Sequence, residues 1–445
     1  MLFKELLEKF SHPLNREVVI SADARTTGTE LVECVQSVKK SLSSMTKCRV
    51  GIVLEATPLC LATLAVLDEA ECDVFLLDGR LDHAGAERLC CEFRLSALIH
   101  QEGKSLSLHV EEISQISPGG GGSSVTILTS GSTGKPKAIR HSWSTLLRPI
   151  RPTTKGLKWA LTYRPSLYAG IQLLLQCLSS EGTLIVPDPE AAPASTADFL
   201  FAAGTQCLSA TPSYWRRLLM FSDEAILRKI PIVQITIGGE VVDQQLLEAL
   251  KRAFPKARIA HIYATTEVGR CFSVHDGLAG FPEQYLQRAF SDGTQLKIEE
   301  GELLACSRNA MTGYDSGSNA EIAPSEWLPT GDLVQVKEGR VLFIGRKSDV
   351  INVGGSKVHP AEVERVIRSV PGVLDVRVYP KRSSLTGNLV ACEVVKQREA
   401  DSNHLTAAIF SRSSAELSSY KRPRIIEFVD EILLSNSFKI MRRQT

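Results

Sequence analysis

The chain has 445 residues, more than one hydrophobic core usually supports, so at least two domains are expected. Hydrophobic residues make up 43% and charged residues 23%, the balance of an ordinary globular protein. Because 51 Lys and Arg face 50 Asp and Glu, the net charge is +1 and no nucleic-acid partner is expected. No apolar stretch is long enough to predict a membrane span. The 11 scattered cysteines, without a CxxC pair, predict reduced thiols and a cytoplasmic location.

The first hundred residues predict short strands that alternate with helices. Residues 1–13 are expected to form a surface helix that turns Phe3, Leu6, Leu7 and Phe10 inward. The further elements expected here are strands at 50–54, 74–77 and 95–99 and helices at 57–70 and 86–93. This alternation favours an α/β fold with a mainly parallel sheet.

A strand at 125–128 leads into the most informative segment of the chain. Its glycines allow phosphate oxygens to approach the backbone, and its hydroxyls and lysines suit a polyphosphate. The candidate residues are Thr129, Ser130, Gly131, Ser132, Thr133, Gly134, Lys135 and Lys137. The segment is not a Walker A loop, because Thr129 and Pro136 occupy positions that require Gly and Ser or Thr. Kinases and P-loop ATPases are therefore disfavoured.

Later strands are expected to end in polar turns. Strands are predicted at 160–163, 183–186, 232–237 and 258–263, and a helix at 169–178. Ligands bind at the carboxyl ends of strands in open α/β sheets, so these turns are candidate binding segments. From about residue 345 the pattern becomes that of a small α+β domain of about a hundred residues. Its expected elements are strands at 373–378, 389–395 and 425–429 and a helix at 405–417.

Several motifs occur in the order typical of one family. After residues 129–137 come Gly238-Gly239-Glu240 and the run Tyr263-Ala264-Thr265-Thr266-Glu267. Further matches are Gly301-Glu302-Leu303, Gly313-Tyr314, Thr330-Gly331-Asp332, Gly345-Arg346, and residues 349–364, 420–424 and 439–442. From about residue 125 to its end, the chain resembles the acyl-adenylate-forming superfamily. It looks most like the smaller acyl-CoA ligases, such as o-succinylbenzoate-CoA ligase.

The resemblance implies an ATP site. Tyr263 would stack on adenine, Thr266 would meet the α-phosphate, and Glu267 would hold Mg²⁺, a role that suits a carboxylate. Asp332 would accept bonds from the ribose hydroxyls, and Lys439 would be the catalytic lysine of the first half-reaction. The remaining nucleotide-binding candidates are Gly238, Gly239, Glu240, Ala264, Thr265 and Arg346.

The resemblance also implies two domains that move. An N-terminal domain of layered α/β sheets would span residues 1–346, and a small mobile α+β domain would span 347–445. Ser348 stands at the hinge position, and Gly354 and Gly355 would line a thiol tunnel after the second domain rotates. The acceptor thiol would belong to coenzyme A or to the phosphopantetheine of an acyl carrier protein.

The segment 163–170 carries no acidic residue that would pair with an α-ammonium group. We therefore expect an aryl or a small to medium carboxylic acid without an α-amine. The candidate pocket residues are Tyr168, Ala169, Gly170, Leu173 and Ile237, for which plain core packing is the other interpretation.

Two other functions stay open. An adenylating ligase that forms amides would share every ATP-site motif. A degenerate nucleotide-binding protein without catalysis is the second, because Phe438 stands where the family has Gly and Ser348 where it often has Asp or Lys.

Overall fold

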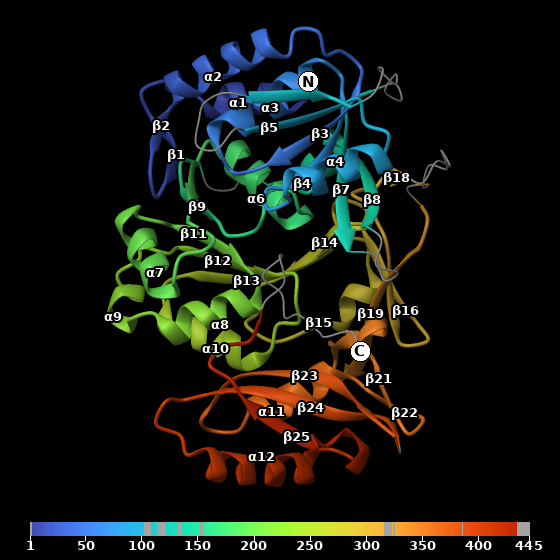
Figure 1. Cartoon of the computed structure of the whole chain (residues 1–445). Coiled ribbons are helices and arrows are strands. Elements are labelled where there is room, and N and C mark those ends of the chain that lie inside the picture. The colour runs from blue at the N-terminus through green and yellow to red at the C-terminus, as the bar shows by residue number, and fades with distance from the viewer. Residues whose placement is uncertain are drawn as a thin grey trace.

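A computed structural model describes residues 2–101, 108–113, 122–130, 136–151, 155–315, 323, 325–384 and 386–433 (Figure 1). Two large sheets stack in its N-terminal part. The first has seven strands in the order β18-β8-β7-β4-β3-β5-β6, and its centre is parallel. Its strands are β3 (Arg49–Leu54), β4 (Asp73–Asp78), β5 (Ala97–Gln101), β6 (Leu108–Glu112), β7 (Ser124–Ser130), β8 (Pro136–Ser142) and β18 (Gly313–Tyr314).

The second sheet has eight strands in the order β14-β13-β12-β11-β9-β10-β1-β2, with antiparallel edges. Its strands are β1 (Glu17–Ser21), β2 (Arg25–Thr27), β9 (Lys158–Leu161), β10 (Thr183–Val186), β11 (Cys207–Ala210), β12 (Gln234–Gly238), β13 (Arg258–Thr265) and β14 (Gly269–Val274). The parallel strands carry nearly continuous apolar runs because helices cover both of their faces.

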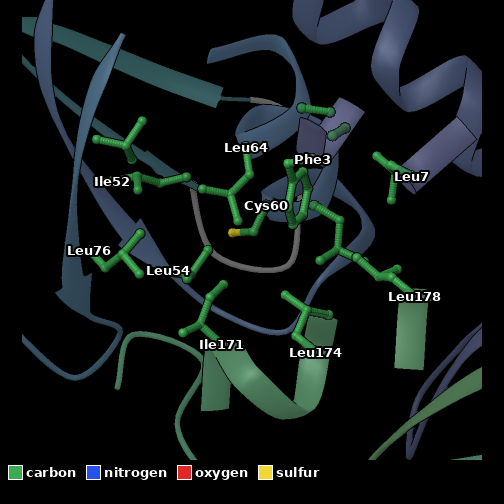
Figure 2. Close-up of a cluster of buried hydrophobic side chains, with 14 of the residues drawn as sticks. Phe3, Leu7, Ile52, Leu54, Cys60, Leu64, Leu76, Ile171, Leu174 and Leu178 are labelled. Atoms are coloured by element: carbon green, nitrogen blue, oxygen red, sulfur yellow. The ribbon is translucent and has the colours of Figure 1, made fainter. Parts of the chain in front are cut away.

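Helices between the two sheets form the main core (Figure 2). They are α1 (Leu2–Phe10), α3 (Pro58–Glu69), α5 (Trp143–Leu147) and α6 (Tyr168–Ser179), with α2 (Gly28–Ser41) packed against α3. Thr57 caps α3 by accepting a hydrogen bond from Cys60 N at 3.2 Å, and Pro58 opens its first turn. Nearly every side chain of α3 is buried, because its neighbours surround it on all sides.

The outer faces of both sheets are covered as well. Helix α4 (His83–Glu92) packs on the seven-stranded sheet. Helices α7 (Pro193–Ala202), α8 (Pro212–Phe221), α9 (Glu224–Leu227) and α10 (Gln244–Ala253) pack on the eight-stranded sheet. The resulting order of layers is helix, sheet, helices, sheet, helices.

A third, antiparallel sheet follows the second in sequence and was not predicted. Its strands are β15 (Phe281–Pro282), β16 (Gln295–Glu299), β17 (Glu302–Cys306), β19 (Leu328–Lys337) and β20 (Arg340–Arg346), and η1 (Glu283–Gln287) follows β15. An aromatic cluster that includes Phe272, Phe281 and Phe343 fills the space beneath it.

The C-terminal part has its own apolar core, which is formed by side chains between Ile351 and Leu417. It contains η2 (Lys347–Asp349), β21 (Ile351–Val353), β22 (Ser356–Val358), α11 (Pro360–Arg368), β23 (Val373–Ser383), β24 (Gly387–Lys396), α12 (Ser402–Glu416), η3 (Ser419–Lys421) and β25 (Ile425–Phe428). In Figure 1 the C-terminal part lies below the green sheet. Its strand β23 faces α8 and α10, whereas its helix α12 lies on the outside.

The structure confirms the predicted α/β class, with a large layered N-terminal part and a small α+β C-terminal part. Each strand and helix expected from the sequence is present, with bounds that shift by a few residues. The division at residues 346 and 347 stays a prediction. Within the described residues, no helix combines the length and apolar character needed to cross a bilayer.

Candidate functional site

A cleft of about 3100 Å³ opens between the ends of the large sheets and the C-terminal part. Most of the predicted site residues that the structure describes line it. These are Thr129, Lys137, Tyr168, Ala169, Leu173, Gly238, Gly239, Glu240, Tyr263, Ala264, Thr265, Thr266, Glu267, Asp332, Arg346 and Ser348. Segments far apart in the sequence therefore meet in one place, as the carboxyl ends of parallel strands predict.

Tyr263 and Arg346 both hold the carboxylate of Asp332. The Tyr263 hydroxyl donates to Asp332 Oδ2 at 2.7 Å, and Arg346 Nε lies 3.0 Å from Asp332 Oδ1. Asp332 and Arg346 lie directly opposite each other on β19 and β20, which places their side chains on one face. Burial, followed by the charge of Asp332, raises the pKa of Tyr263 well above its ordinary value. Tyr263 is therefore a neutral donor at physiological pH.

The segment around Asp332 is braced from the neighbouring strand β17. Gly331 N donates to Glu302 Oε1 at 3.0 Å, and Lys347 Nζ lies 3.1 Å from Glu302 Oε2. Thr330 Oγ1 donates to Leu303 O at 2.7 Å. Glu302 thus connects the Gly301–Leu303 motif to the Thr330–Asp332 motif, a structural role that the sequence alone did not reveal.

A buried histidine fixes the backbone of Thr266. His141 Nε2 donates to Thr266 O at 2.8 Å, and its Nδ1 lies 3.2 Å from Thr145 Oγ1. Burial lowers the pKa of His141 to about 4, so the ring is neutral. On the next residue, Met311 N donates to Glu267 O at 2.8 Å. The side chains of Thr266 and Glu267 are thereby presented to the cleft on a fixed backbone.

Sequence reasoning missed His141. The available signal was a histidine at a buried position of the alternating strand 136–142, which by itself indicates only a satisfied core residue.

The turn after β12 combines two glycines with a capping carboxylate. A Cβ atom on Gly238 would lie 3.2 Å from Ile262 O, and Gly239 has a φ of +87°. Glu240 Oε2 accepts from Ser213 N at 2.9 Å, in the first turn of α8. The glycines bring the backbone close to the next strand, and Glu240 fixes the turn to the helix.

The strands β7 and β8 flank the predicted phosphate segment. They pair in antiparallel fashion, with Thr129 opposite Lys137 and Ser130 opposite Pro136. The GY motif joins the same sheet, because Tyr314 pairs with Ile139. Gly131, Ser132, Thr133, Gly134 and Lys135 lie outside the described residues, as does the side chain of Ser130.

Two residues of the predicted acyl pocket, Ile237 and Gly170, lie away from the described cleft wall. Ile237 is 0% exposed and packs among core residues of α8 and α10, because side chains alternate along β12. The residues of β12 that line the cleft are Gln234, Thr236 and Gly238. Gly170 is buried against the preceding loop, where a Cβ atom would lie only 1.8 Å from Arg164 O. Its lack of a side chain permits helix packing, and it forms no part of the described cleft wall.

Four residues were predicted as site residues in the C-terminal part, and the structure describes three of them. Gly354 and Gly355 form the two-residue turn of the β21–β22 hairpin, with φ values of +54° and +85°. Ser348 lies in η2, and its Oγ donates to Asp349 Oδ1 at 2.9 Å. Lys439 lies outside the described residues.

The carboxylate that the cleft offers suits one divalent cation, provided that a bound ligand supplies further oxygen donors. Among the described residues, no group of three His, Cys, Asp or Glu side chains is arranged to hold a metal ion. Glu267 supplies one hard carboxylate, and Mg²⁺ usually takes one or two carboxylates and completes its shell with phosphates and water. The residues present therefore fit Mg²⁺ bound together with a nucleotide.

Four buried ionic side chains join the two parts of the chain below the cleft. Arg216 of α8 pairs with Asp243, which caps α10, and Arg368 of α11 lies 3.2 Å from the same carboxylate. Arg368 also lies 3.1 Å from Asp375 of β23. The side chains of these four residues are at most 15% exposed. We call them the interdomain ion cluster.

The structure has layered sheets, a second, smaller unit and a cleft between the two. These features define a class of two-part α/β ligand-binding proteins. Comparison with known families narrows this class. The profile of the AMP-binding enzymes matches residues 66–314, and that of the AMP-binding enzyme C-terminal domain matches residues 362–439. The chain belongs to the AMP-binding enzyme family.

Characterised relatives and solved structures agree with this family. A 4-chlorobenzoate–CoA ligase of Arthrobacter sp. is 29% identical over 346 residues, which are 71% of this chain and 64% of that protein. A long-chain-fatty-acid–CoA ligase of Escherichia coli is 30% identical over 225 residues, 48% of this chain and 40% of that protein. The chain thus spans less than two thirds of the length of these relatives.

The fold is shared with solved structures over nearly the whole chain. The anthranilate CoA ligase AuaEII in complex with anthranoyl-AMP has a TM-score of 0.79 at 18% identity, covering 98% of this chain and 95% of that one. A variant of E. coli MenE with bound OSB-AMS has a TM-score of 0.76 at 20% identity, covering 98% and 96%. At these identities the likeness shows the fold.

Proposed function

We propose that the chain uses ATP and Mg²⁺ to convert a carboxylic acid to its acyl-adenylate and then transfers the acyl group to a thiol. The thiol would belong to coenzyme A or to the phosphopantetheine of a carrier protein. The observation that carries this proposal is the convergence of Asp332, Tyr263 and Arg346 with Thr266 and Glu267 in one cleft. The names of the relatives, which include CoA ligases for aromatic and fatty acids, support the acid and the thiol.

In the first half-reaction, a carboxylate oxygen of the acid attacks the α-phosphorus of ATP. A new O–P bond forms, the bond to the bridging oxygen breaks, and pyrophosphate leaves. Mg²⁺, when bound, neutralises charge on the phosphate oxygens. The chain positions the reactants and stabilises charge, since no covalent protein intermediate is needed. Thr266 would donate to the α-phosphate, and Lys439 would approach it from the C-terminal part.

In the second half-reaction, a thiolate sulfur attacks the acyl carbon and AMP leaves with the electrons of the C–O bond. The hinge at Ser348 and the hairpin turn at Gly354 and Gly355 would serve this step.

All 11 cysteines are free in the structure, which supports the proposed cytoplasmic location.

Pyrophosphate release with ATP, Mg²⁺ and a panel of aryl and aliphatic acids tests the proposal. We expect acid-dependent release that falls at least about a hundredfold in Glu267→Gln, which removes the proposed Mg²⁺ ligand, and in Lys439→Ala, which removes the proposed positive charge at the phosphates. Glu224→Gln, an exposed change in α9, is the matched control and should retain full activity. Acid-independent release, or equal release by all variants, would overturn the proposal. Offering amines beside thiols distinguishes the amide-forming alternative.

A further inference from the structure

Arg270 follows the Tyr263–Glu267 motif and occupies the wall of the cleft nearest to Tyr168. Its backbone N donates to Tyr168 Oη at 3.0 Å, and its carbonyl accepts from Asn309 Nδ2 at 3.1 Å. On the sheet it lies directly opposite Ala264. Opposed residues of an antiparallel pair share a face, so the Arg270 side chain projects on the cleft side beside Ala264.

The guanidinium group of Arg270 has only neutral partners. Its Nη1 donates to Pro149 O at 2.9 Å, and its Nη2 donates to Ser273 Oγ at 2.7 Å. Within the described part of the chain, no carboxylate lies within 4.0 Å of it. A guanidinium carries five N–H groups, so about three remain for a ligand.

Two other partly buried arginines of the cleft do have carboxylate partners. Arg216 and Arg368, whose side chains are 10% and 12% exposed, both contact carboxylates. At Arg270, burial lowers the pKa, and the positive charge of Arg151 acts in the same direction. An unpaired, partly buried cation costs stability unless a ligand compensates it, which makes such a residue a candidate for substrate recognition.

The cleft wall on the Tyr168 side combines apolar and polar side chains. Tyr168 and Leu173 supply apolar wall, and Gln172 and Gln176 lie on the same face of α6. The negative charge of Asp292 acts on Arg270 in the direction that raises its pKa, but Asp292 forms no ion pair with Arg270 and accepts from Asn309 Nδ2 at 2.9 Å. Among the described residues, the cleft wall therefore offers a cation that no carboxylate contacts directly, and Asp292 acts on it only from beyond 4.0 Å.

We propose that the acid activated in this cleft carries a second carboxylate, which Arg270 binds, so that Arg270 selects diacids over monoacids of the same length. The inference rests on the proposed function, because it assumes that the Tyr168 side of the cleft receives the acid. A planar guanidinium with free N–H groups matches a carboxylate in shape and charge. Arg270 would be a specificity-determining residue, and the reacting carboxylate would lie at Thr266.

Paired acids test this inference. Each aliphatic acid of four to eight carbons is compared with the diacid in which a carboxylate replaces its terminal methyl, and benzoate is compared with the three benzenedicarboxylates. We expect kcat/KM of the wild type to favour at least one diacid by about tenfold or more. Arg270→Met should remove about 10- to 100-fold of the diacid activity and change the monoacid activity less than about threefold. Arg270→Lys should restore part of the diacid preference.

Binding measured without turnover separates the two proposals. Calorimetric titration of each acid pair, with a non-hydrolysable ATP analogue present, should show the same diacid preference in the wild type and its loss in Arg270→Met. If Arg270→Met does not fold, Arg270→Gln retains a donor for Pro149 O and is titrated instead. Equal losses for both members of every pair would overturn the inference, since Arg270 would then only position the wall. Diacid binding without any acid-dependent pyrophosphate release would support the inference and refute the proposed activity.

Discussion

Individual residues show how the motif Tyr263–Glu267 is held. Within this motif, the backbone carbonyl of Thr266 accepts a hydrogen bond from His141, and that of Glu267 accepts one from Met311 N. Neither donor belongs to the motif, so the sequence predicted residues that line the cleft and missed those that hold their backbone in place. The reason is physical: a single buried histidine on a strand has the same pattern as an ordinary core residue.

Replacing His141 by Gln should change how stability depends on pH. The folded pKa is about 4 and the unfolded pKa about 6.5, so between these values only the unfolded chain binds the proton. Stability is therefore lost as the pH falls through this range, by about 3 kcal/mol in total. Denaturant unfolding at pH 7 and pH 5 should show a loss about 2 kcal/mol smaller in His141→Gln than in the wild type. Equal losses would show that His141 titrates normally.

Replacing Asp332 by Asn should weaken nucleotide binding more than it slows the chemistry. The carboxylate accepts from Tyr263 and pairs with Arg346, and the proposal gives it the ribose hydroxyls as well. Hydrogen bonds to a charged group contribute about 1.5–3 kcal/mol, so KM for ATP should rise about 10- to 100-fold. Asp276→Asn is a matched control, since that carboxylate pairs with Arg340 at 2.8 Å outside the described cleft wall. An unchanged KM would contradict the ribose role.

At the scale of elements, the hydrophobic pattern predicted most of the central parallel strands of the large sheets and several helices, while many edge strands and surface helices were not predicted. Ile237 was placed in the pocket, yet β12 alternates polar and apolar residues, and its polar positions Gln234 and Thr236 line the cleft while Ile237 lies in the core. The third sheet was missed for a different reason. Its strands between 281 and 346 pair with shifts of register, and their alternation is broken by the GEL and TGD motifs.

Helix α6 offers a test of packing beside the cleft. In Gly170→Ala the new Cβ atom would meet backbone, Arg164 O at 1.8 Å, so the helix or the loop must shift. We expect a loss of about 1–3 kcal/mol or more in denaturant unfolding, despite the better helix propensity of Ala. Gly51→Ala is the matched control, because its nearest contacts, such as Cys90 Sγ at 2.9 Å, are side-chain atoms that can yield. An equal or smaller loss in Gly170→Ala would contradict this account.

At the scale of the whole molecule, the interdomain ion cluster fixes how the C-terminal part lies on the N-terminal part. Rotation of the C-terminal domain, which the proposed second half-reaction involves, must separate Arg368 from Asp243. Buried ion pairs are costly to break one side at a time, because the remaining charge is left without compensation. The cluster therefore favours the arrangement seen here over others.

Asp243→Asn should loosen this arrangement. It leaves Arg216 and Arg368 without their shared carboxylate, and removal of one partner of a buried pair costs about 3–5 kcal/mol. Hydrogen exchange should become faster in α11 and β23, and the chain should become more sensitive to proteolysis near residues 347–349. Glu431→Gln is the matched control, because the Arg217–Glu431 pair also joins the two parts but is exposed, and its loss should cost under about 1 kcal/mol. Equal effects of the two variants would contradict a special role for the buried cluster.

If this chain forms an acyl-adenylate, that species can be trapped on the enzyme. The enzyme is mixed with a substrate acid and ATP radiolabelled at the α-phosphate, without a thiol, and quenched with acid. We predict an acid-dependent acyl-AMP, bound at up to one equivalent, that disappears as AMP and a thioester form when coenzyme A or a phosphopantetheinyl carrier protein is added. Production of ADP and phosphate in place of AMP, or tight ATP binding with no labelled adduct for any acid, would contradict the account.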